Sequence, residues 1–404
     1  MKINTQSLSR RIGGGILFMA VTGLASAANF GTDLNLTMMP AAGGMGGVGL
    51  SSPQDAGAAV FGNPSTLEQF AEGRFVLGGT YYTPEVEADH DGLGLTWTGE
   101  SEAGPYLIPN VAVIQPLSET TSMGLGLSAV SGVGSDFRGV SGSLDPVAEI
   151  LVFGANAGLS HAISDQLSLG FMATIGFGLG QAGLAENTAS TSGFGFRVTL
   201  GADYLVDHTR LGFYYRSPLA IQYDNMVRYD SGAFHSPTFE QPAEIGLGIS
   251  NGALMDGALL IEFNVVLKDW DSAESYQDIY ENQTVLAFGA QFSDGDYRWR
   301  LGFIHAESPI KQNVGAQVGD IDSLYIEALG GMTPMSAPLT QYVQAVNAEV
   351  IWENQLTAGL GWTIDSHLIL DLHVALAMEE DEQIGATQVT ASAWQTGAAL
   401  SWVF

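Results

Sequence analysis

The chain of 404 residues contains no cysteine, and only 13 lysine and arginine residues stand against 43 aspartate and glutamate residues. Without cysteine there is no disulfide framework and no thiolate chemistry. The net charge of −30 repels phosphates, so nucleic acid is excluded as a partner. We expect the carboxylates to lie in solvated loops; loops that bind divalent cations are the alternative.

The first 27 residues have the pattern of a secretory signal peptide. Basic residues precede an apolar stretch over residues 12–23, and Ala25-Ser26-Ala27 forms a small-residue cleavage site. The apolar stretch is too short for a membrane span. We therefore assign residues 1–27 to a signal peptide and expect the mature chain to begin at Ala28.

Beyond this segment the chain lacks any run that approaches about 18 uncharged apolar residues, which excludes a transmembrane helix. Hydrophobic residues nevertheless make up 46% of the chain, and 52 residues are glycine. That glycine content is about twice the usual share of roughly 7%. An exported, glycine-rich and aromatic-rich chain without a membrane helix is typical of a transmembrane β-barrel.

Strand-length segments alternate between apolar and small side chains. Residues 167–179 read "LSLGFMATIGFGL", where only Met172 breaks the alternation, and residues 194–204 and 368–378 show the same period. A soluble sandwich has bulky inner faces and charged outer faces, whereas the second face here is small and nearly uncharged. Barrel strands in lipid alternate in this way over about 10 residues. The sequence therefore predicts an all-β, transmembrane antiparallel β-barrel.

The period also separates the chain into regions. Residues 28–70 have no strand period and are rich in glycine and alanine, and the first good strand starts near Arg74. Residues 71–404 have room for on the order of fourteen strands. Residues 310–347 lack alternation, which predicts a long external loop with a short helix near residues 338–350.

A few charged residues fall on the face that would line the lumen. They cannot stay unpaired there, and a structural network of ion pairs inside the barrel is the favoured interpretation over a transport site. These residues are Arg197, Asp203, Arg216, Glu262, Lys268, Arg298, Arg300 and Asp371.

The chain ends on an alternating strand, "SAWQTGAALSWVF". Trp402 and Phe404 share its apolar face, which resembles the C-terminal signature of bacterial outer-membrane proteins. We expect these two residues to act as the assembly signal.

Residues 44–49 read Gly-Met-Gly-Gly-Val-Gly, a literal match to the dinucleotide-binding pattern. That pattern requires a preceding strand, a following helix and an acidic residue about 20 positions on. None of these surrounds the glycines, so we expect tight turns rather than a nucleotide site. An exposed, mobile N-terminal tail is the alternative to a folded plug.

Several ordered segments resemble the FadL/TodX-type outer-membrane transporters for long-chain fatty acids and hydrocarbons. They are "GGVGLSSPQDAGAAVFGNPSTL", "LIPNVAVIQPL", "SGVGSDFRG", "TRLGFYYRSPLAIQYDN" and "YRWRLGFIHAESPI". The resemblance implies a fourteen-stranded barrel whose lumen is closed by an N-terminal hatch, with lateral exit of the ligand into the bilayer at a kink in the third strand. Carried over by position, the hatch covers residues 28–70, and Ser65 departs from the alanine usual in the family. The implied hatch and gating residues are Asp55, Phe61, Asn63, Pro64 and Ser65.

The same resemblance places the third strand near Met123 to Ser131 and its kink at Gly132 and Gly134. Glycine inside a strand permits a bend or a bulge. Two glycines that simply face a crowded lumen are the alternative.

Three functions are compatible with an outer-membrane barrel: hydrophobic uptake, general diffusion and lipid modification. Uptake of hydrophobic small molecules, either fatty acids or hydrocarbons, fits the resemblance and the plug-like N-terminus, whereas a general porin needs an open lumen. A lipid-modifying barrel enzyme needs a nucleophile and a base together, and only His161 and Ser164 are suggestive. We expect no enzyme activity, no cofactor and no metal site. The scarcity of basic residues slightly favours acceptance of uncharged hydrocarbons as well as fatty acids.

The expected partners follow from this reading. They are a hydrophobic ligand, outer-membrane lipids and the outer-membrane assembly machinery, and the protein is expected to be a monomer in the outer membrane of a Gram-negative bacterium.

Overall fold

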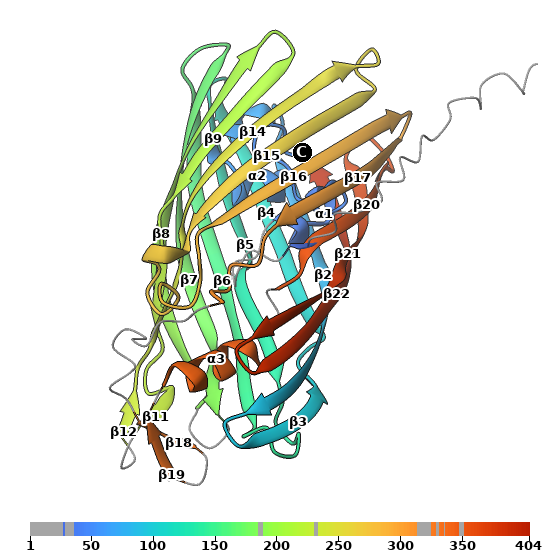
Figure 1. Ribbon diagram of the computed structural model, residues 1–404. Helices are drawn as coiled ribbons and strands as arrows, with labels where there is room; N and C mark the ends of the chain where they lie inside the picture. Colours follow the sequence, from blue (N-terminus) through green and yellow to red (C-terminus); the bar gives the residue numbers. More distant parts are fainter. Residues whose placement is uncertain are drawn as a thin grey trace, which may run out of the picture.

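The computed structural model describes residues 27–28, 36–184, 189–229, 233–312, 325–328, 331–334, 336–346 and 351–404. Within them, fourteen antiparallel strands form a barrel in which each strand pairs with the next along the chain (Figure 1). The barrel closes because β2 pairs with β22. The predicted all-β barrel of about fourteen strands is confirmed. Its strands are β2 (Arg74–Gly92), β4 (Tyr106–Ser118), β5 (Thr121–Asp136), β6 (Pro146–Ala162), β7 (Leu167–Leu184), β8 (Thr191–Val206), β9 (Thr209–Arg216), β14 (Ala243–Leu254), β15 (Leu259–Asp269), β16 (Gln283–Asp294), β17 (Tyr297–Ala306), β20 (Glu353–Thr363), β21 (Leu368–Ile384) and β22 (Thr387–Val403).

The alternation in the sequence sets which way each side chain points. On β7, Leu169, Phe171 and Ile175 are exposed on the outer surface, while Thr174 is buried inside. Met172, the residue that breaks the alternation, also points inward and is 1% exposed. A belt of apolar side chains around the outside suits lipid contact, because a barrel in a bilayer turns its apolar face outward.

The two ends of the barrel differ in their connections (Figure 1). At one end, which we call the short-turn end, tight turns such as residues 207–208 and 295–296 join neighbouring strands. At the other, the long-loop end, lie β3 (Leu95–Glu100), η5 (Trp270–Ser272), α3 (Ala337–Ala345) and a four-stranded sheet. That sheet consists of β11 (Val227–Tyr229), β12 (Ala233–His235), β18 (Tyr325–Ala328) and β19 (Gly331–Pro334).

The connection between β17 and β20 contains α3, in the stretch where the sequence predicts a short helix. The long external loop predicted from the sequence, residues 310–347, falls partly on residues 313–324, which lie outside the described residues. Tyr342 of α3 packs edge-on against His90 and Trp97, so this helix covers the β2–β3 side of the long-loop end. Burial raises the pKa of the Tyr342 hydroxyl.

The segment before the first barrel strand lies inside the barrel (Figure 1). It consists of η1 (Leu36–Met38), α1 (Pro40–Gly43), α2 (Ala56–Phe61) and η2 (Pro64–Gln69), and most of its residues are buried. We call residues 36–70 the hatch. The predicted signal peptide and the first part of the predicted hatch lie outside the described residues, apart from β1 (Ala27–Ala28), which pairs with β20. No helix in the described part of the chain is long and apolar enough to cross a membrane.

A second element narrows the lumen from the long-loop end. In the connection between β9 and β14, β10 (Leu219–Gln222) pairs with β13 (Thr238–Gln241). Leu219 and Ile221 pack against the inner faces of β7 and β8, where the glycines leave room for them. The barrel interior is therefore filled from both ends.

Candidate functional site

The hatch rests directly on the backbone of the barrel wall. A Cβ atom on Gly302 would collide with the backbone of Gly46, and one on Gly170 would collide with the backbone of Pro64 and Ser65. Glycine is required at such points because no larger residue allows two backbones to approach so closely. Small residues that alternate with apolar ones in the strands, such as Gly170 and Gly302, therefore form the surface of the wall that contacts the hatch.

The glycine run at residues 44–49 forms tight turns between α1 and α2. Gly46 has φ +73° and Gly47 has φ +64°, which are values in the left-handed region that favours glycine. The Gly46 amide donates to Thr357 Oγ1 on β20 at 2.8 Å. These glycines turn the chain and bind the wall, as the sequence predicts for a plug.

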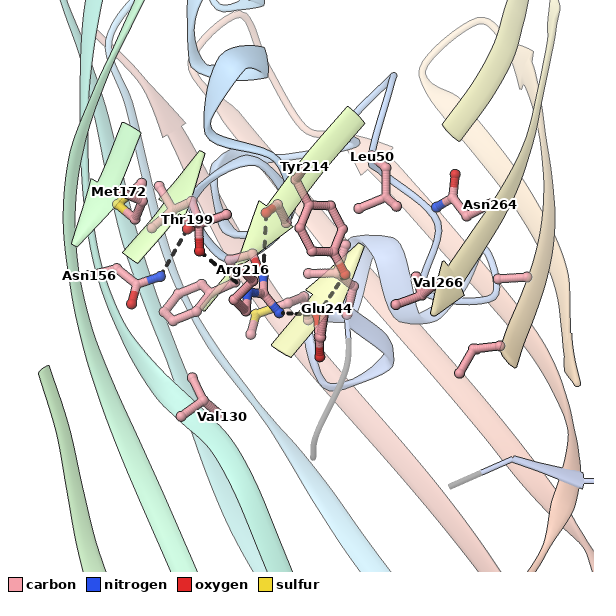
Figure 2. A pocket seen from close by; sticks show the side chains of 18 of the residues that line it. Leu50, Val130, Asn156, Met172, Thr199, Tyr214, Arg216, Glu244, Asn264 and Val266 are labelled. Atoms are coloured by element: carbon pink, nitrogen blue, oxygen red, sulfur yellow. Dashed lines mark hydrogen bonds and ion pairs between the residues drawn. The ribbon is translucent and has the colours of Figure 1, made fainter. Parts of the chain in front are cut away.

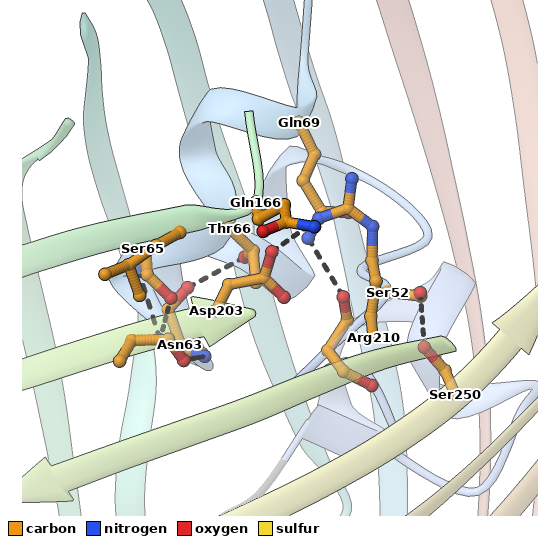
Figure 3. Close-up of polar contacts among 12 residues, drawn as sticks. Ser52, Asn63, Ser65, Thr66, Gln69, Gln166, Asp203, Arg210 and Ser250 are labelled. Atoms are coloured by element: carbon orange, nitrogen blue, oxygen red, sulfur yellow. Dashed lines mark hydrogen bonds and ion pairs between the residues drawn. The ribbon is translucent and has the colours of Figure 1, made fainter. Parts of the chain in front are cut away.

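Asn63 bonds three parts of the structure, and Figure 3 shows its contact with Ser65. Its Nδ2 donates to the Leu50 carbonyl at 2.8 Å and to the Ala202 carbonyl on β8 at 3.2 Å. Its Oδ1 accepts from the amide and the hydroxyl of Ser65, at 3.2 and 2.8 Å. The hydroxyl of Ser65 is thereby satisfied at full burial, which explains how this buried position accommodates a serine. Pro64 occupies the first position of η2, where its missing N–H costs nothing.

The other two predicted hatch residues belong to α2. Asp55 caps the helix, because its Oδ1 accepts from the Ala58 amide at 2.8 Å. Burial raises the pKa of Asp55 to about 6, and the negative charge of Asp371 adds to the shift. At the other end of the helix, Arg216 on β9 donates from Nη2 to the Phe61 carbonyl at 2.6 Å.

A cavity lies between the hatch and the wall (Figure 2). Apolar side chains from both sides line most of it, and polar side chains gather at one corner around Glu244. The lining residues include Leu36, Met39, Leu50, Val60, Phe61, Val130, Met172, Val266, Val285 and Ile304. A mostly apolar cavity with a few convergent polar groups is the usual form of a small-molecule site.

The polar corner is an ion-pair group in which one carboxylate faces two cations. Glu244 Oε2 lies 3.0 Å from Arg216 Nη1, and Oε1 lies 2.8 Å from Lys268 Nζ. The Tyr214 hydroxyl donates to the same carboxylate at 2.7 Å. Arg197 also lines the cavity, so its polar lining carries more positive than negative charge.

Other lumen charges pair within the wall, in line with the network interpretation. Arg300 binds Asp371 at 2.6 Å, and Arg210 pairs with Asp203. Glu262 is different: its carboxylate accepts hydrogen bonds from hatch amides. Its assignment to the ion-pair network is therefore wrong, because among the described residues its partners are backbone N–H groups and the Asn264 amide rather than a cation.

The barrel wall has a gap between its second and third strands. β4 and β5 pair from Ser118 and Thr121 as far as Asn110 and Ser128, and the pairing stops there. Beyond that point, towards the long-loop end, β4 continues along β2 and β5 continues along β6. The register of β5 is irregular at Val130, a bulge of the kind that bends a strand.

A cavity of about 240 Å³ occupies this gap. Gly132 and Gly134, the predicted kink residues, both line it, and the bulge at Val130 lies just before them. Tyr106 and Tyr82 line the β4 side, with stacked rings 6.5 Å apart. Val130 itself lines the hatch cavity, so β5 contributes neighbouring residues to both cavities.

The C-terminal residues lie at the barrel seam, at the short-turn end. Trp402 packs against Phe75 of β2 with the ring centroids 5.7 Å apart. The Phe404 amide donates to the Gly73 carbonyl at 3.0 Å. The Phe404 side chain is 63% exposed. Their predicted role in assembly stays a prediction.

The two residues considered for catalysis are engaged elsewhere. His161 Nδ1 bonds Thr121 Oγ1 at 2.9 Å, and the Ser164 hydroxyl accepts from the amides of the following turn. In the described residues no group of three or more histidine, aspartate or glutamate side chains is arranged to hold a metal ion.

Sequence reasoning did not identify Glu244 or Tyr106. Glu244 sits on an alternating strand, "AEIGLGIS", at a lumen-facing position, so the period could have revealed it. Nothing in the sequence marks Tyr106, because the gap that it lines exists only between paired strands.

The structure was compared with known proteins. No family model and no curated protein matches the sequence. The toluene transporter TodX of P. putida matches with a TM-score of 0.66 and 16% identity, over 92% of this chain and 99% of TodX. A FadL homologue of Pseudomonas aeruginosa matches with a TM-score of 0.65 and 14% identity, over 94% and 99% of the two chains. The Ralstonia pickettii toluene transporter TbuX matches with a TM-score of 0.60 and 18% identity, over 92% and 99%.

These likenesses extend over nearly the whole of each chain, which confirms at the level of the fold the resemblance seen in the sequence. The protein has the fold of the TodX, TbuX and FadL-homologue structures, a closed fourteen-stranded antiparallel barrel with its N-terminal segment inside.

Proposed function

We propose that the chain is a FadL/TodX-type transporter that takes up hydrophobic small molecules across the outer membrane of a Gram-negative bacterium. Outer-membrane barrels have short periplasmic turns and longer extracellular loops. The short-turn end would thus face the periplasm and the long-loop end the exterior. The apolar belt on the outer surface would lie in the bilayer.

The observation that carries the proposal is the early end of pairing between β4 and β5, at Asn110 and Ser128. The hatch fills the lumen, so a straight path through the barrel is closed. The gap instead offers a sideways path: its cavity is lined by Gly132 and Gly134, and the hatch cavity is lined by Val130, two residues earlier on β5. A hydrophobic ligand that leaves through this gap enters lipid without crossing water.

A general porin is disfavoured because an open, water-filled lumen cannot coexist with a buried hatch. A lipid-modifying enzyme is disfavoured because His161 and Ser164 bond other groups. The proteins of similar structure include toluene transporters and a monoaromatic hydrocarbon channel. Those substrates support hydrophobic uptake here.

Within this class, the polar corner of the hatch cavity favours a ligand with a carboxylate. Arg197, Arg216 and Lys268 line the cavity together with Glu244, and a ligand carboxylate beside these cations would be electrostatically favourable. The apolar lining would hold the hydrocarbon part. We therefore propose fatty acids as the preferred ligands over plain hydrocarbons, which revises the slight preference drawn from the count of basic residues.

The test is uptake by cells that lack their own transporter of this type. Cells that express this chain should take up a long-chain fatty acid and toluene faster than empty-vector cells. Lys268→Met, which keeps the side-chain volume, should lower fatty acid uptake more than toluene uptake. No gain for either ligand contradicts the transport function, and equal effects of Lys268→Met on both ligands contradict the carboxylate preference.

A further inference from the structure

In the short segment Gly49–Ser52, between the two helices of the hatch, the first three residues are buried and Ser52 is half-buried, and no strand or helix satisfies the backbone. Buried N–H and C=O groups need partners, since each one left unpaired costs as much as a lost hydrogen bond. The partners of this segment are side chains. They come from both the hatch and the barrel.

The barrel supplies one residue that binds the amides of this segment. Glu262 on β15 is 1% exposed, and its Oε1 accepts from the amides of Gly49 and Ser51 at 3.0 Å each. Its Oε2 accepts from the Ser52 amide, also at 3.0 Å. Hydrogen bonds to an ionised acceptor are roughly twice as strong as neutral ones.

The hatch itself supplies the partners of the carbonyls. Asn63 binds the Leu50 carbonyl at 2.8 Å, and Gln69 binds the Ser51 carbonyl at 2.9 Å. The segment is thus clamped on both sides: amide side chains of the hatch hold its carbonyls, and a wall carboxylate holds its N–H groups.

No lysine or arginine forms an ion pair with Glu262 in the part of the chain that the structure describes. Besides the three hatch amides, the amide of Asn264 donates to Glu262 Oε1 at 2.9 Å in the orientation that its surroundings require. The hatch backbone is therefore the main compensation for this buried charge. If the hatch moved away, the carboxylate of Glu262 would lose most of its hydrogen-bond partners. Opening of the hatch is therefore opposed by the cost of leaving this buried charge without them.

We propose that Glu262 is the latch of the closed hatch, a positioning residue that holds the Gly49–Ser52 segment against β15. This proposal rests on the assignment of the barrel as a hatch-gated channel. It goes beyond that assignment, because the sequence pattern of the hatch points to no residue on β15.

Because the chain has no native cysteine, a single introduced thiol can report the opening of the hatch. Ser51 is fully buried in the segment, so Ser51→Cys gives a single thiol that a membrane-impermeant maleimide reaches only when the hatch opens. The substitution keeps the Ser51 amide. Labelling of the full-length protein in detergent is followed over time, with boiled protein as the fully open reference.

Glu262→Gln in the Ser51→Cys background should raise the labelling rate by about tenfold or more, because charge-assisted hydrogen bonds to the segment are weakened. The matched control is Glu353→Gln, because the Glu353 carboxylate also accepts a hydrogen bond from a backbone amide, that of Ser308 at 3.2 Å, but outside the hatch. It should leave the rate near that of the parent.

A labelling rate of Glu262→Gln equal to that of the parent or of Glu353→Gln overturns the proposal. If Glu262→Gln fails to assemble, Glu262→Asp carries the same test, because the shorter side chain keeps the charge but loses reach; an unchanged rate again overturns the proposal. Labelling reports the hatch and not uptake. A protein that carried none of the tested ligands would therefore leave this result intact.

Discussion

The side chain of Tyr106 lies against Gly134 across the gap between β4 and β5, so close that a Cβ atom on Gly134 would overlap the tyrosine hydroxyl. Tyr106 therefore occupies part of the space that the missing strand pairing leaves, beside the cavity. Glycine at position 134 is what allows it to do so. The width of the proposed exit depends on these two residues.

Side chains added on β5 should narrow this exit. Gly132→Val together with Gly134→Val is expected to slow hydrophobic uptake several-fold, because the new side chains crowd the cavity that both glycines line. Uptake is measured in cells, and assembly is checked by the shift in gel mobility between unboiled and boiled samples. Adding Tyr106→Ala should restore part of the uptake. Unchanged uptake in an assembled double variant would place the exit elsewhere.

Asn63 should be the hatch side chain whose loss loosens the plug most. Asn63→Ala removes the bonds to the Leu50 and Ala202 carbonyls and should destabilise hatch docking by about 1–3 kcal/mol. The measurement is proteolysis of the hatch in the intact barrel. Asn251→Ala is the control, because Asn251 bonds Thr209 within the wall. Equal protection of the two variants would contradict the role of Asn63.

Docking of the hatch should depend on pH through Asp55. Its pKa in the docked hatch is about 6 against 3.8 when free, so the docked state favours the protonated carboxyl. This contribution is fully present below the free pKa and is lost as the pH rises through about 6. The shift corresponds to at most about 3 kcal/mol.

We expect the rate of hatch proteolysis to be lower below about pH 5 than above about pH 7. At each pH the rate is divided by the rate for a free peptide of residues 36–73, which removes the pH dependence of the protease. Asp55→Asn keeps an oxygen to cap α2 and cannot ionise, so it should flatten this dependence. A variant with the same pH profile as the parent would show that another group is responsible.

The last residue should matter for assembly more than for stability. Phe404 is 63% exposed and makes one backbone bond to Gly73, so its removal costs little packing. Deletion of Phe404 should nevertheless lower the amount of heat-modifiable barrel in the outer membrane. Phe404→Tyr, which keeps an aromatic end, serves as the comparison. Normal amounts of the truncated barrel would remove the assembly role.

The sequence by itself determined the barrel and the direction of its side chains. A period of two is a local property, and it predicted that Phe171 and Ile175 face outward. The resemblance to FadL/TodX-type transporters added the prediction that the residues near Asn63 form a plug, where the composition alone left an exposed tail open. The period needs only neighbours along the chain, and the resemblance needs only the order of short motifs.

The tertiary structure alone decided which lumen groups meet. Alternation says that Glu262 and Lys268 face inward, but it gives neither their height in the barrel nor the strand or hatch segment opposite them. Glu262 therefore binds amides from a segment more than 200 positions earlier, instead of the cation that the sequence suggested. The gap beside Tyr106 was equally hidden, since it depends on where β4 and β5 cease to pair. Such contacts arise from the closure of the sheet and from the fit of the hatch within it, which no local pattern encodes.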